Sequence, residues 1–198
     1  THSTGRRQRQ MCIRDSTSVG KMLTDQEIRI ERAGQDGIGE IVIRGPNIMA
    51  GYYRNQAATD EVLSSDGWLR TGDLGYLDDQ GNLQITGRAK ELIIRSGFNV
   101  YPLEVEAALN QHPQVVQAAV IGHSSNGNED IVAFIQPLAS SGLVPDQLKS
   151  HLKDQLAAYK HPTRWIISDQ LPAAPSGKIL KARLATVFAD KLSANRKY

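Results

Sequence analysis

The alternation of apolar strands with helix-patterned segments after residue 88 most constrains the fold of this chain. Residues 114–122 and 131–136 are dominated by apolar side chains, as buried strands are. Residues 145–159 and 178–192 instead repeat apolar side chains at helical spacing. Strands interleaved with helices predict an α+β fold in which one sheet is covered by helices.

Three further elements complete this prediction. Short strands are expected at residues 91–95 and 165–168, and a helix is expected from Pro102 to about residue 110, because proline suits a first helical turn. In the last helix, 178–192, one face is expected to carry Leu180, Leu184, Val187 and Phe188.

The chain before residue 89 has a β-rich texture. A strand is predicted at residues 40–44, which Gly45-Pro46 ends. A β-hairpin is predicted with strands at 74–77 and 83–86 and a turn between them. Asn55 is a candidate N-cap for a short helix over the next residues.

These sequence patterns predict that the chain consists of three parts. Residues 1–19 show no apolar period and are expected to be a disordered or non-native tail. Residues 20–88 hold too few elements to bury much apolar surface, so we interpret them as the C-terminal end of a larger domain. Residues 89–198 are expected to form a small domain that folds alone.

Composition excludes several classes of function. The chain has 198 residues and a formal net charge of only +2, so it lacks the basic character expected of a nucleic-acid-binding protein. No apolar run approaches the roughly 20 residues that span a bilayer. Cys12 is the single cysteine, which precludes an internal disulfide and favours a cytoplasmic setting. The histidines are too scattered to predict a metal site.

Three motifs carry the candidate chemistry. They are Gly-Trp-Leu-Arg-Thr-Gly-Asp at 67–73, the run that opens with Gly-Arg-Ala-Lys-Glu at 87–91 and continues to residue 106, and Leu-Pro-Ala-Ala-Pro-Ser-Gly-Lys at 171–178. In order and spacing they resemble the acyl-activating, adenylate-forming superfamily of acyl-CoA synthetases, carrier-protein adenylation domains and luciferases. The Gly-Tyr-Tyr-Arg-Asn run at 51–55 resembles the segment before the first motif in those enzymes.

Asp73 and Arg88 are the candidate nucleotide-binding residues. An ionised carboxylate can accept hydrogen bonds from two neighbouring hydroxyls, and a guanidinium offers donors to ribose or phosphate oxygens. Taken alone, Asp73 favours a bond to its own backbone in a Thr-Gly-Asp turn before a strand, and Arg88 favours a surface ion pair. The resemblance implies that both contact the nucleotide.

Lys90 and Gly97 are assigned roles by the resemblance. The residue two positions after the motif arginine is the family's hinge, which makes Lys90 the expected hinge of a small mobile C-terminal domain. Gly97 is expected in a loop between a strand and a helix, where glycine permits close backbone approach. The resemblance implies that this loop lines the tunnel for the pantetheine arm of CoA.

Lys178 is the candidate catalytic residue. It follows Pro-Ser-Gly at 175–177, which suggests a flexible approach, and it could alternatively be a plain lysine in the first turn of the last helix. The resemblance implies that it reaches the carboxylate substrate and the nucleotide during adenylation. At an effective dielectric constant of about 20, two unit charges about 4 Å apart interact by about 4 kcal/mol, enough to affect a rate strongly.

The resemblance implies ATP, Mg²⁺ and CoA as cofactors and a fatty or aryl carboxylic acid as substrate. The phosphate loop, adenine-binding segment, magnesium-binding glutamate and acyl pocket are not found in this sequence, so the absent large domain is the expected intramolecular partner, and the chain alone is expected to be inactive. Two alternatives stay open: the tail of a carrier-protein adenylation domain, which the absence of a carrier segment after Tyr198 disfavours, and a non-catalytic α/β binding module.

Overall fold

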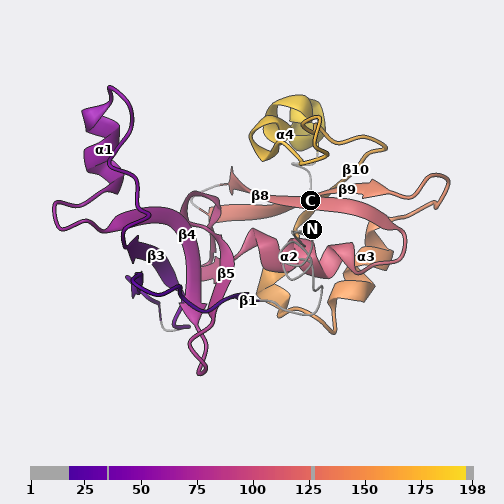
Figure 1. The fold of residues 1–198 in the computed structure, drawn as a ribbon. Helices are drawn as coiled ribbons and strands as arrows, with labels where there is room; N and C mark the ends of the chain where they lie inside the picture. Colours follow the sequence, from indigo (N-terminus) through magenta and orange to yellow (C-terminus); the bar gives the residue numbers. More distant parts are fainter. Residues whose placement is uncertain (1–17, 35, 126–127, 195–198) are drawn as a thin grey trace, which may run out of the picture. The chain divides into compact units, whose positions relative to one another are not determined.

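The computed structural model describes residues 18–34, 36–125 and 128–194 and divides the chain into two compact units, with the division between Ala89 and Lys90 (Figure 1). No helix within the described residues is both long and apolar enough to cross a membrane.

The first unit is a five-stranded antiparallel sheet in the order β1-β5-β4-β3-β2. Its strands are β1 (Ser18–Gly20), β2 (Glu27–Glu31), β3 (Gly39–Arg44), β4 (Leu69–Leu77) and β5 (Leu83–Arg88). Among the described residues of this unit, the buried apolar side chains are Ile41, Val42, Trp68 and Leu74. The core that they form is small.

Helix α1 (Gln56–Val62) and the hairpin of β4 and β5 form where the sequence predicted them. The side chain of Asn55 accepts a hydrogen bond from the Ala58 amide at 3.0 Å, so it caps the helix as expected. Strand β4 begins five residues earlier than predicted, at Leu69 rather than residue 74. The first motif is therefore part of the sheet.

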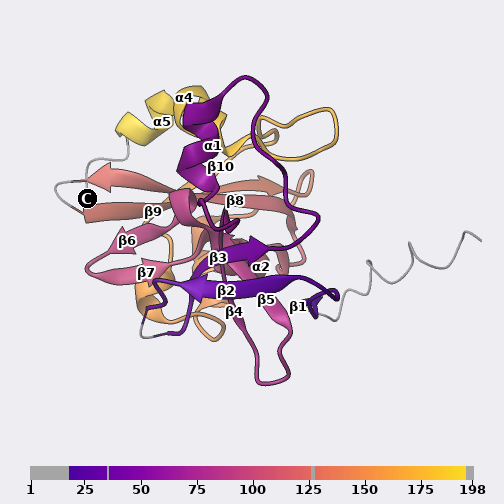
Figure 2. The ribbon, with the colours of Figure 1, turned by 60° about the vertical axis from the view of Figure 1, so that its left-hand side comes forward.

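The second unit is built on a three-stranded sheet in the order β10-β9-β8. β8 (Val115–Ser125) and β9 (Asn128–Pro137) are antiparallel, while β10 (Arg164–Ile167) runs parallel to β9. A separate hairpin of β6 (Ile93–Arg95) and β7 (Phe98–Val100) packs with β6 beside β9 (Figure 2). The sequence did not predict β7, because three residues are too few to show a period.

Helices cover both faces of this sheet (Figure 1). One core contains the β9 side chains Ile131, Ala133 and Ile135, packed with residues of α2 (Pro102–Asn110) and α3 (Pro145–Leu152). The other contains Val132 and Phe134, packed with residues of α4 (Lys181–Val187) and α5 (Ala189–Ala194). Successive side chains of a strand point to opposite faces, which explains why β9 reads as one continuous apolar run.

Two predicted helices are shorter than expected. α3 ends at Leu152, and the short 3₁₀-helix η3 (Ala158–Lys160) follows it after a gap. The last helix begins at Lys181 rather than 178 and is broken at Phe188 into α4 and α5. Leu184 and Phe188 face the core, but Val187 is 51% exposed, so the predicted apolar face is partly wrong.

Candidate functional site

Asp73 lies in a bulge within strand β4. Glu40 pairs with Leu74 and Val42 with Arg70, so residues 71–73 oppose the single residue Ile41. Gly72, with φ of +70°, supplies the left-handed conformation that this extra length requires. The sequence predicted a Thr-Gly-Asp turn before a strand, but the structure shows a bulge within strand β4. Residues on both sides of the triplet, Arg70 and Leu74, pair with β3.

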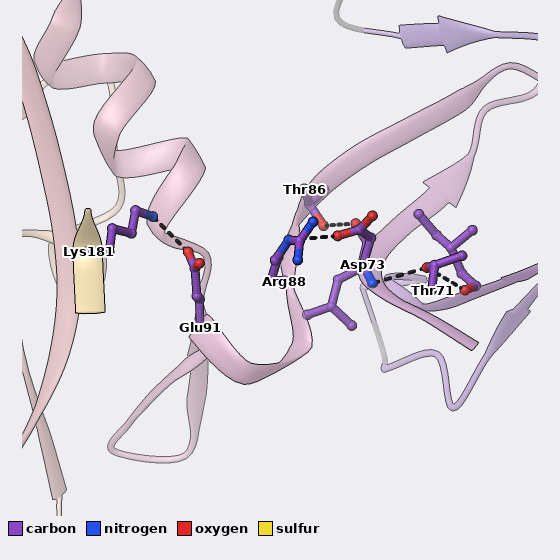
Figure 3. Close-up of polar contacts among 8 residues, drawn as sticks. Thr71, Asp73, Thr86, Arg88, Glu91 and Lys181 are labelled. Atoms are coloured by element: carbon purple, nitrogen blue, oxygen red, sulfur yellow. Dashed lines mark hydrogen bonds and ion pairs between the residues drawn. The ribbon is translucent and has the colours of Figure 1, made fainter. Parts of the chain in front are cut away.

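The hydroxyl of Thr71 fixes this bulge from both sides. Its Oγ1 donates to the Ile41 carbonyl at 2.7 Å and accepts from the Asp73 amide at 3.1 Å. These two bonds replace the ladder bonds that the bulge interrupts, and they hold the Asp73 carboxylate at one position on the sheet (Figure 3).

Arg88, the last residue of β5, lies directly opposite Asp73 in the register of β4 and β5. Its Nε lies 3.1 Å from Asp73 Oδ1, as the dashed line in Figure 3 marks. The Arg88 side chain is 55% exposed and that of Asp73 28%. The structure therefore brings the two candidate nucleotide-binding residues together on an accessible part of the first unit.

Lys90 is exposed and is the first residue of the second unit. It lies in a single 3₁₀ turn, η2 (Ala89–Glu91), where a strand over 91–95 was predicted to begin. The observed strand β6 starts only at Ile93. The sequence did not predict this turn, because Ala-Lys-Glu contains neither glycine nor proline to mark a break before the strand.

Gly97 lies in the two-residue turn of the β6–β7 hairpin, not between a strand and a helix as predicted. Ser96 and Gly97 both have positive φ, +52° and +82°, as the favoured two-residue hairpin turn requires. The Ser96 amide donates to Asn128 Oδ1 at 2.9 Å, and Asn128 Nδ2 donates to Ser96 Oγ at 3.2 Å. The turn is thereby tied to the start of β9.

An exposed aromatic pair lies next to the Gly97 turn. Phe98 and Tyr159 stack with ring centroids 4.8 Å apart and are 54% and 37% exposed. Arg95 Nη1 donates to the His161 carbonyl at 3.0 Å and so holds this segment against β6. Sequence reasoning missed the pair because 61 positions separate its members and no local pattern links them.

Lys178 lies on the second strand of a small hydrogen-bonded hairpin. The Ala174 amide donates to the Lys178 carbonyl, the Gly177 amide to Ala174, and the Leu180 amide to Pro172, each at 2.8 Å. The predicted flexible approach is wrong, because these bonds close a regular turn in which Gly177 has φ of +82°. Within the described residues the exposed Lys178 ammonium has no ion-pair partner.

Lys181, three residues further on, has the opposite environment. Its Nζ lies 2.7 Å from Glu91 Oε2 and 2.8 Å from Glu106 Oε1 (Figure 3 draws the pair with Glu91). Burial opposes the charged form of Lys181, but the two carboxylates outweigh it and its pKa is raised. Burial raises the pKa of Glu106, despite hydrogen bonds from Lys181 and from the Val120 amide. No local pattern in the sequence predicted this cluster, because its members lie in three distant segments.

The candidate residues thus form separate groups. Asp73 pairs with Arg88 in the first unit, whereas Gly97 and Lys178 belong to different hairpins of the second. Over the part of the chain that the structure describes, no group of three or more His, Cys, Asp or Glu side chains is arranged to hold a metal ion.

The chain is similar in sequence to known proteins. Residues 104–178 match the family model of the AMP-binding enzyme C-terminal domain, and Lys178 is the last residue matched. The chain is 38% identical to a putative acyl-CoA synthetase, YngI, of Bacillus subtilis over 179 residues, 87% of this chain and 33% of that protein. It is 42% identical to 4-coumarate–CoA ligase 1 of Arabidopsis thaliana over 184 residues, 89% of this chain and 33% of that one.

Solved structures show the same likeness. The ATP-bound structure of MatB from Rhodopseudomonas palustris superposes with a TM-score of 0.79 at 34% identity, covering 88% of this chain and 36% of that one. These matches and the family model define the class: the chain belongs to the adenylate-forming superfamily. More particularly, it carries the C-terminal domain of AMP-binding enzymes, and its relatives include acyl-CoA and aryl-CoA ligases. The chain spans about a third of the length of the curated relatives it matches.

Proposed function

We propose that this chain is the C-terminal part of an AMP-forming acid–thiol ligase that acts on a fatty or aryl carboxylic acid. In the first half-reaction the carboxylate attacks the α-phosphate of ATP and releases pyrophosphate. In the second, the thiol of CoA attacks the acyl-adenylate, forms a thioester and releases AMP. The first step builds the leaving group that the second step needs.

The observation that carries the proposal is the presentation of Lys178. An ordered hairpin holds its backbone, while its ammonium is exposed and makes no ion pair among the described residues. An unpaired cation on a rigid support suits the stabilisation of charge on a carboxylate and a phosphate during adenylation. Lys178 is therefore the catalytic residue of our proposal.

Asp73 and Arg88 are proposed to bind the nucleotide. Arg88 Nε pairs with Asp73 Oδ1. The Asp73 carboxylate can accept further hydrogen bonds, which suits it to the ribose hydroxyls. The remaining donors of the half-exposed guanidinium suit ribose or phosphate oxygens. Their register on adjacent strands supports a shared task.

Lys90 and Gly97 are proposed to serve the change between the two steps. Lys90 begins the second unit in a single 3₁₀ turn, a place where a few backbone angles can absorb a rotation. Gly97 lies in an exposed hairpin turn. Because glycine has no side chain, its backbone permits close approach of the pantetheine arm of CoA.

The residues present fit only part of the implied cofactor set. Asp73 and Arg88 suit the nucleotide of ATP, and the Gly97 turn suits CoA. No arrangement of acidic side chains among the described residues suits Mg²⁺, so we assign its ligands to the large domain. That domain is the proposed intramolecular partner, and without it the chain is proposed to be inactive.

The first experiment measures pyrophosphate release by the 198-residue chain alone, with ATP and a panel of fatty and aryl acids. We expect none, and robust turnover would contradict the proposed division of the active site. The second uses the complete enzyme, in which this chain is joined to a large domain. Lys178→Gln should slow acyl-adenylate formation at least about tenfold, because it removes the charge and even half of a ~4 kcal/mol interaction corresponds to more than about tenfold in rate.

The control for this variant is Lys149→Gln. Lys149 is also exposed, but it pairs with Asp146 on the surface of α3, so its loss should leave both half-reactions unchanged. Equal effects of the two variants would refute the catalytic role. A further measurement replaces CoA by a carrier protein as the thiol acceptor in the second half-reaction. Thioester formation with the carrier protein but not with CoA would identify a carrier-dependent enzyme. Thioester formation with neither acceptor would favour a non-catalytic binding module.

A further inference from the structure

The ion pairs of Lys181 join three segments that are far apart in the sequence. Glu91 ends the 3₁₀ turn directly after Lys90, Glu106 lies on α2, and Lys181 is the first residue of α4. We call these three residues the carboxylate clamp. The Lys181 side chain is only 21% exposed and Glu106 only 11%, so solvent screens these charges less than those of a surface pair.

The clamp lies at the base of the Lys178 hairpin. The hairpin's last backbone bond runs from the Leu180 amide to the Pro172 carbonyl, and the next residue is Lys181. Backbone bonds hold the two strands together, whereas apolar contacts attach the hairpin to the core, since Leu171 is buried there and Ile179 packs partly against it. Apolar contacts are non-directional, whereas two charge-assisted hydrogen bonds on one ammonium set a direction.

We propose that Lys181 is a positioning residue whose ion pairs with Glu91 and Glu106 orient the Lys178 hairpin relative to the segment that follows Lys90. A rotation at Lys90 then carries Lys178 with it as one rigid part of the second unit. This inference rests on the proposed function, because it assigns Lys181 a task only through Lys178.

The Gly97 turn is anchored independently of the clamp. Its contacts go to Asn128 through Ser96, and the Ile94 amide donates to Glu129 Oε2 at 2.6 Å. Loss of the clamp should therefore disturb the Lys178 hairpin and spare the Gly97 turn. This separation gives the proposal a specific signature.

The first test measures amide hydrogen exchange in the 198-residue chain. Lys181→Met should speed exchange of the Ala174, Gly177 and Leu180 amides at least about fivefold, because the hairpin loses its directional support. Exchange in β9 and at the Ser96 amide should stay unchanged. Lys181→Arg, which keeps the charge, should stay within about twofold of wild type, and Lys191→Met, a change at an exposed lysine of α5, should have no effect.

Unchanged exchange in the hairpin of Lys181→Met would overturn the proposal. If that variant instead exchanges faster throughout the sheet, Glu91→Gln, which leaves the Glu106 pair in place, becomes the deciding variant. It must accelerate the same three amides locally, and failure to do so would equally overturn the proposal.

The second test uses the complete enzyme and separates the two half-reactions. Lys181→Met should lower kcat for acyl-adenylate formation about tenfold with little change in KM for ATP, because positioning rather than binding is lost. Thioester formation from preformed acyl-adenylate should keep its wild-type rate, and Lys181→Arg should restore most of the loss.

Lys178→Gln distinguishes the two ways in which this test can fail. If Lys178→Gln adenylates as fast as wild type, the proposed function itself is wrong. If Lys178→Gln is slow while Lys181→Met matches wild type, the proposed function stands and only the positioning role fails.

Discussion

Arg88 Nε lies 3.1 Å from Asp73 Oδ1, across two strands that pair these residues in register. The pair is accessible, with the arginine side chain more than half exposed. Exposed ion pairs contribute only about 0–1 kcal/mol to stability. Folding therefore gains little from a pair that the bulge of β4 holds so specifically, and a role in ligand binding accounts for it better.

Asp73→Asn tests this distinction. In the 198-residue chain it should lower the free energy of unfolding by less than about 1 kcal/mol, because the pair is exposed to solvent. In the complete enzyme it should raise KM for ATP about tenfold, the effect of losing about 1.4 kcal/mol of binding. Chemical denaturation and steady-state kinetics measure the two effects.

The matched control is Glu27→Gln, which breaks the exposed Arg44–Glu27 pair in the same sheet. It should cost as little stability and leave the KM for ATP unchanged. A large loss of stability in Asp73→Asn with an unaltered KM would identify the pair as structural.

Gly97→Ala should destabilise the chain by roughly 1–2 kcal/mol, the cost of a left-handed conformation for a residue with a side chain. A Cβ at this position meets no atom within 4 Å, so the cost comes from φ of +82° and not from a clash. Thermal and chemical unfolding measure it. In the complete enzyme the same variant should slow transfer to CoA more than adenylation.

Gly87→Ala is the control for the backbone argument. Its Cβ also meets nothing within 4 Å, but its φ lies outside the left-handed region. It should therefore be tolerated much better, and equal destabilisation by the two variants would contradict the assigned cause.

The buried Glu106 predicts a pH dependence of stability. Because burial raises its pKa in the folded state above the ordinary value of 4.5, the folded chain binds this proton more tightly than the unfolded chain. The contribution of Glu106 to stability is greatest below pH 4.5 and is lost as the pH rises through the folded pKa. Wild-type stability should therefore fall relative to Glu106→Gln across that window, as urea denaturation at a series of pH values can measure.

A difference between wild type and Glu106→Gln that stays constant or grows with pH would contradict this direction.

Two of the ring pairs in the second unit, Phe134–Phe188 and Phe98–Tyr159, should contribute very differently to stability. Phe134 is fully buried and packs with Phe188 at 5.4 Å between centroids, so Phe134→Ala should cost about 3–5 kcal/mol. Phe98→Ala removes the half-exposed partner of Tyr159 and should cost less than about 1.5 kcal/mol. Denaturation of both variants under identical conditions checks the ranking, which equal losses would refute.

Elements with a local signal were predictable from the sequence. Three elements occur where the sequence pattern predicted them: strand β3, helix α1 with its Asn55 cap, and helix α2, which begins at Pro102. Their signals lie within a few neighbouring residues, in β-branched runs, a capping side chain and a helix-starting proline. The fold class followed from the order of such elements.

Features that depend on distant residues were not predictable. Lys181 meets Glu91 from 90 positions away, and the bulge at Asp73 exists only because both of its flanks pair with β3. The break at Phe188 was missed as well, because Leu184 and Phe188 share a helical face whether or not the helix continues through them. Pairing register and tertiary charge contacts leave no periodic trace in a single sequence.

Strand β9 presents five consecutive residues, 131–135, with no exposed surface, because helices pack on both of its faces. These positions are unavailable for contact with any ligand. A change in what the second unit binds has to arise in the connecting turns, such as those at Gly97 and Lys178. Such changes leave both cores intact, so the unit can acquire new chemistry without first acquiring a new way to fold.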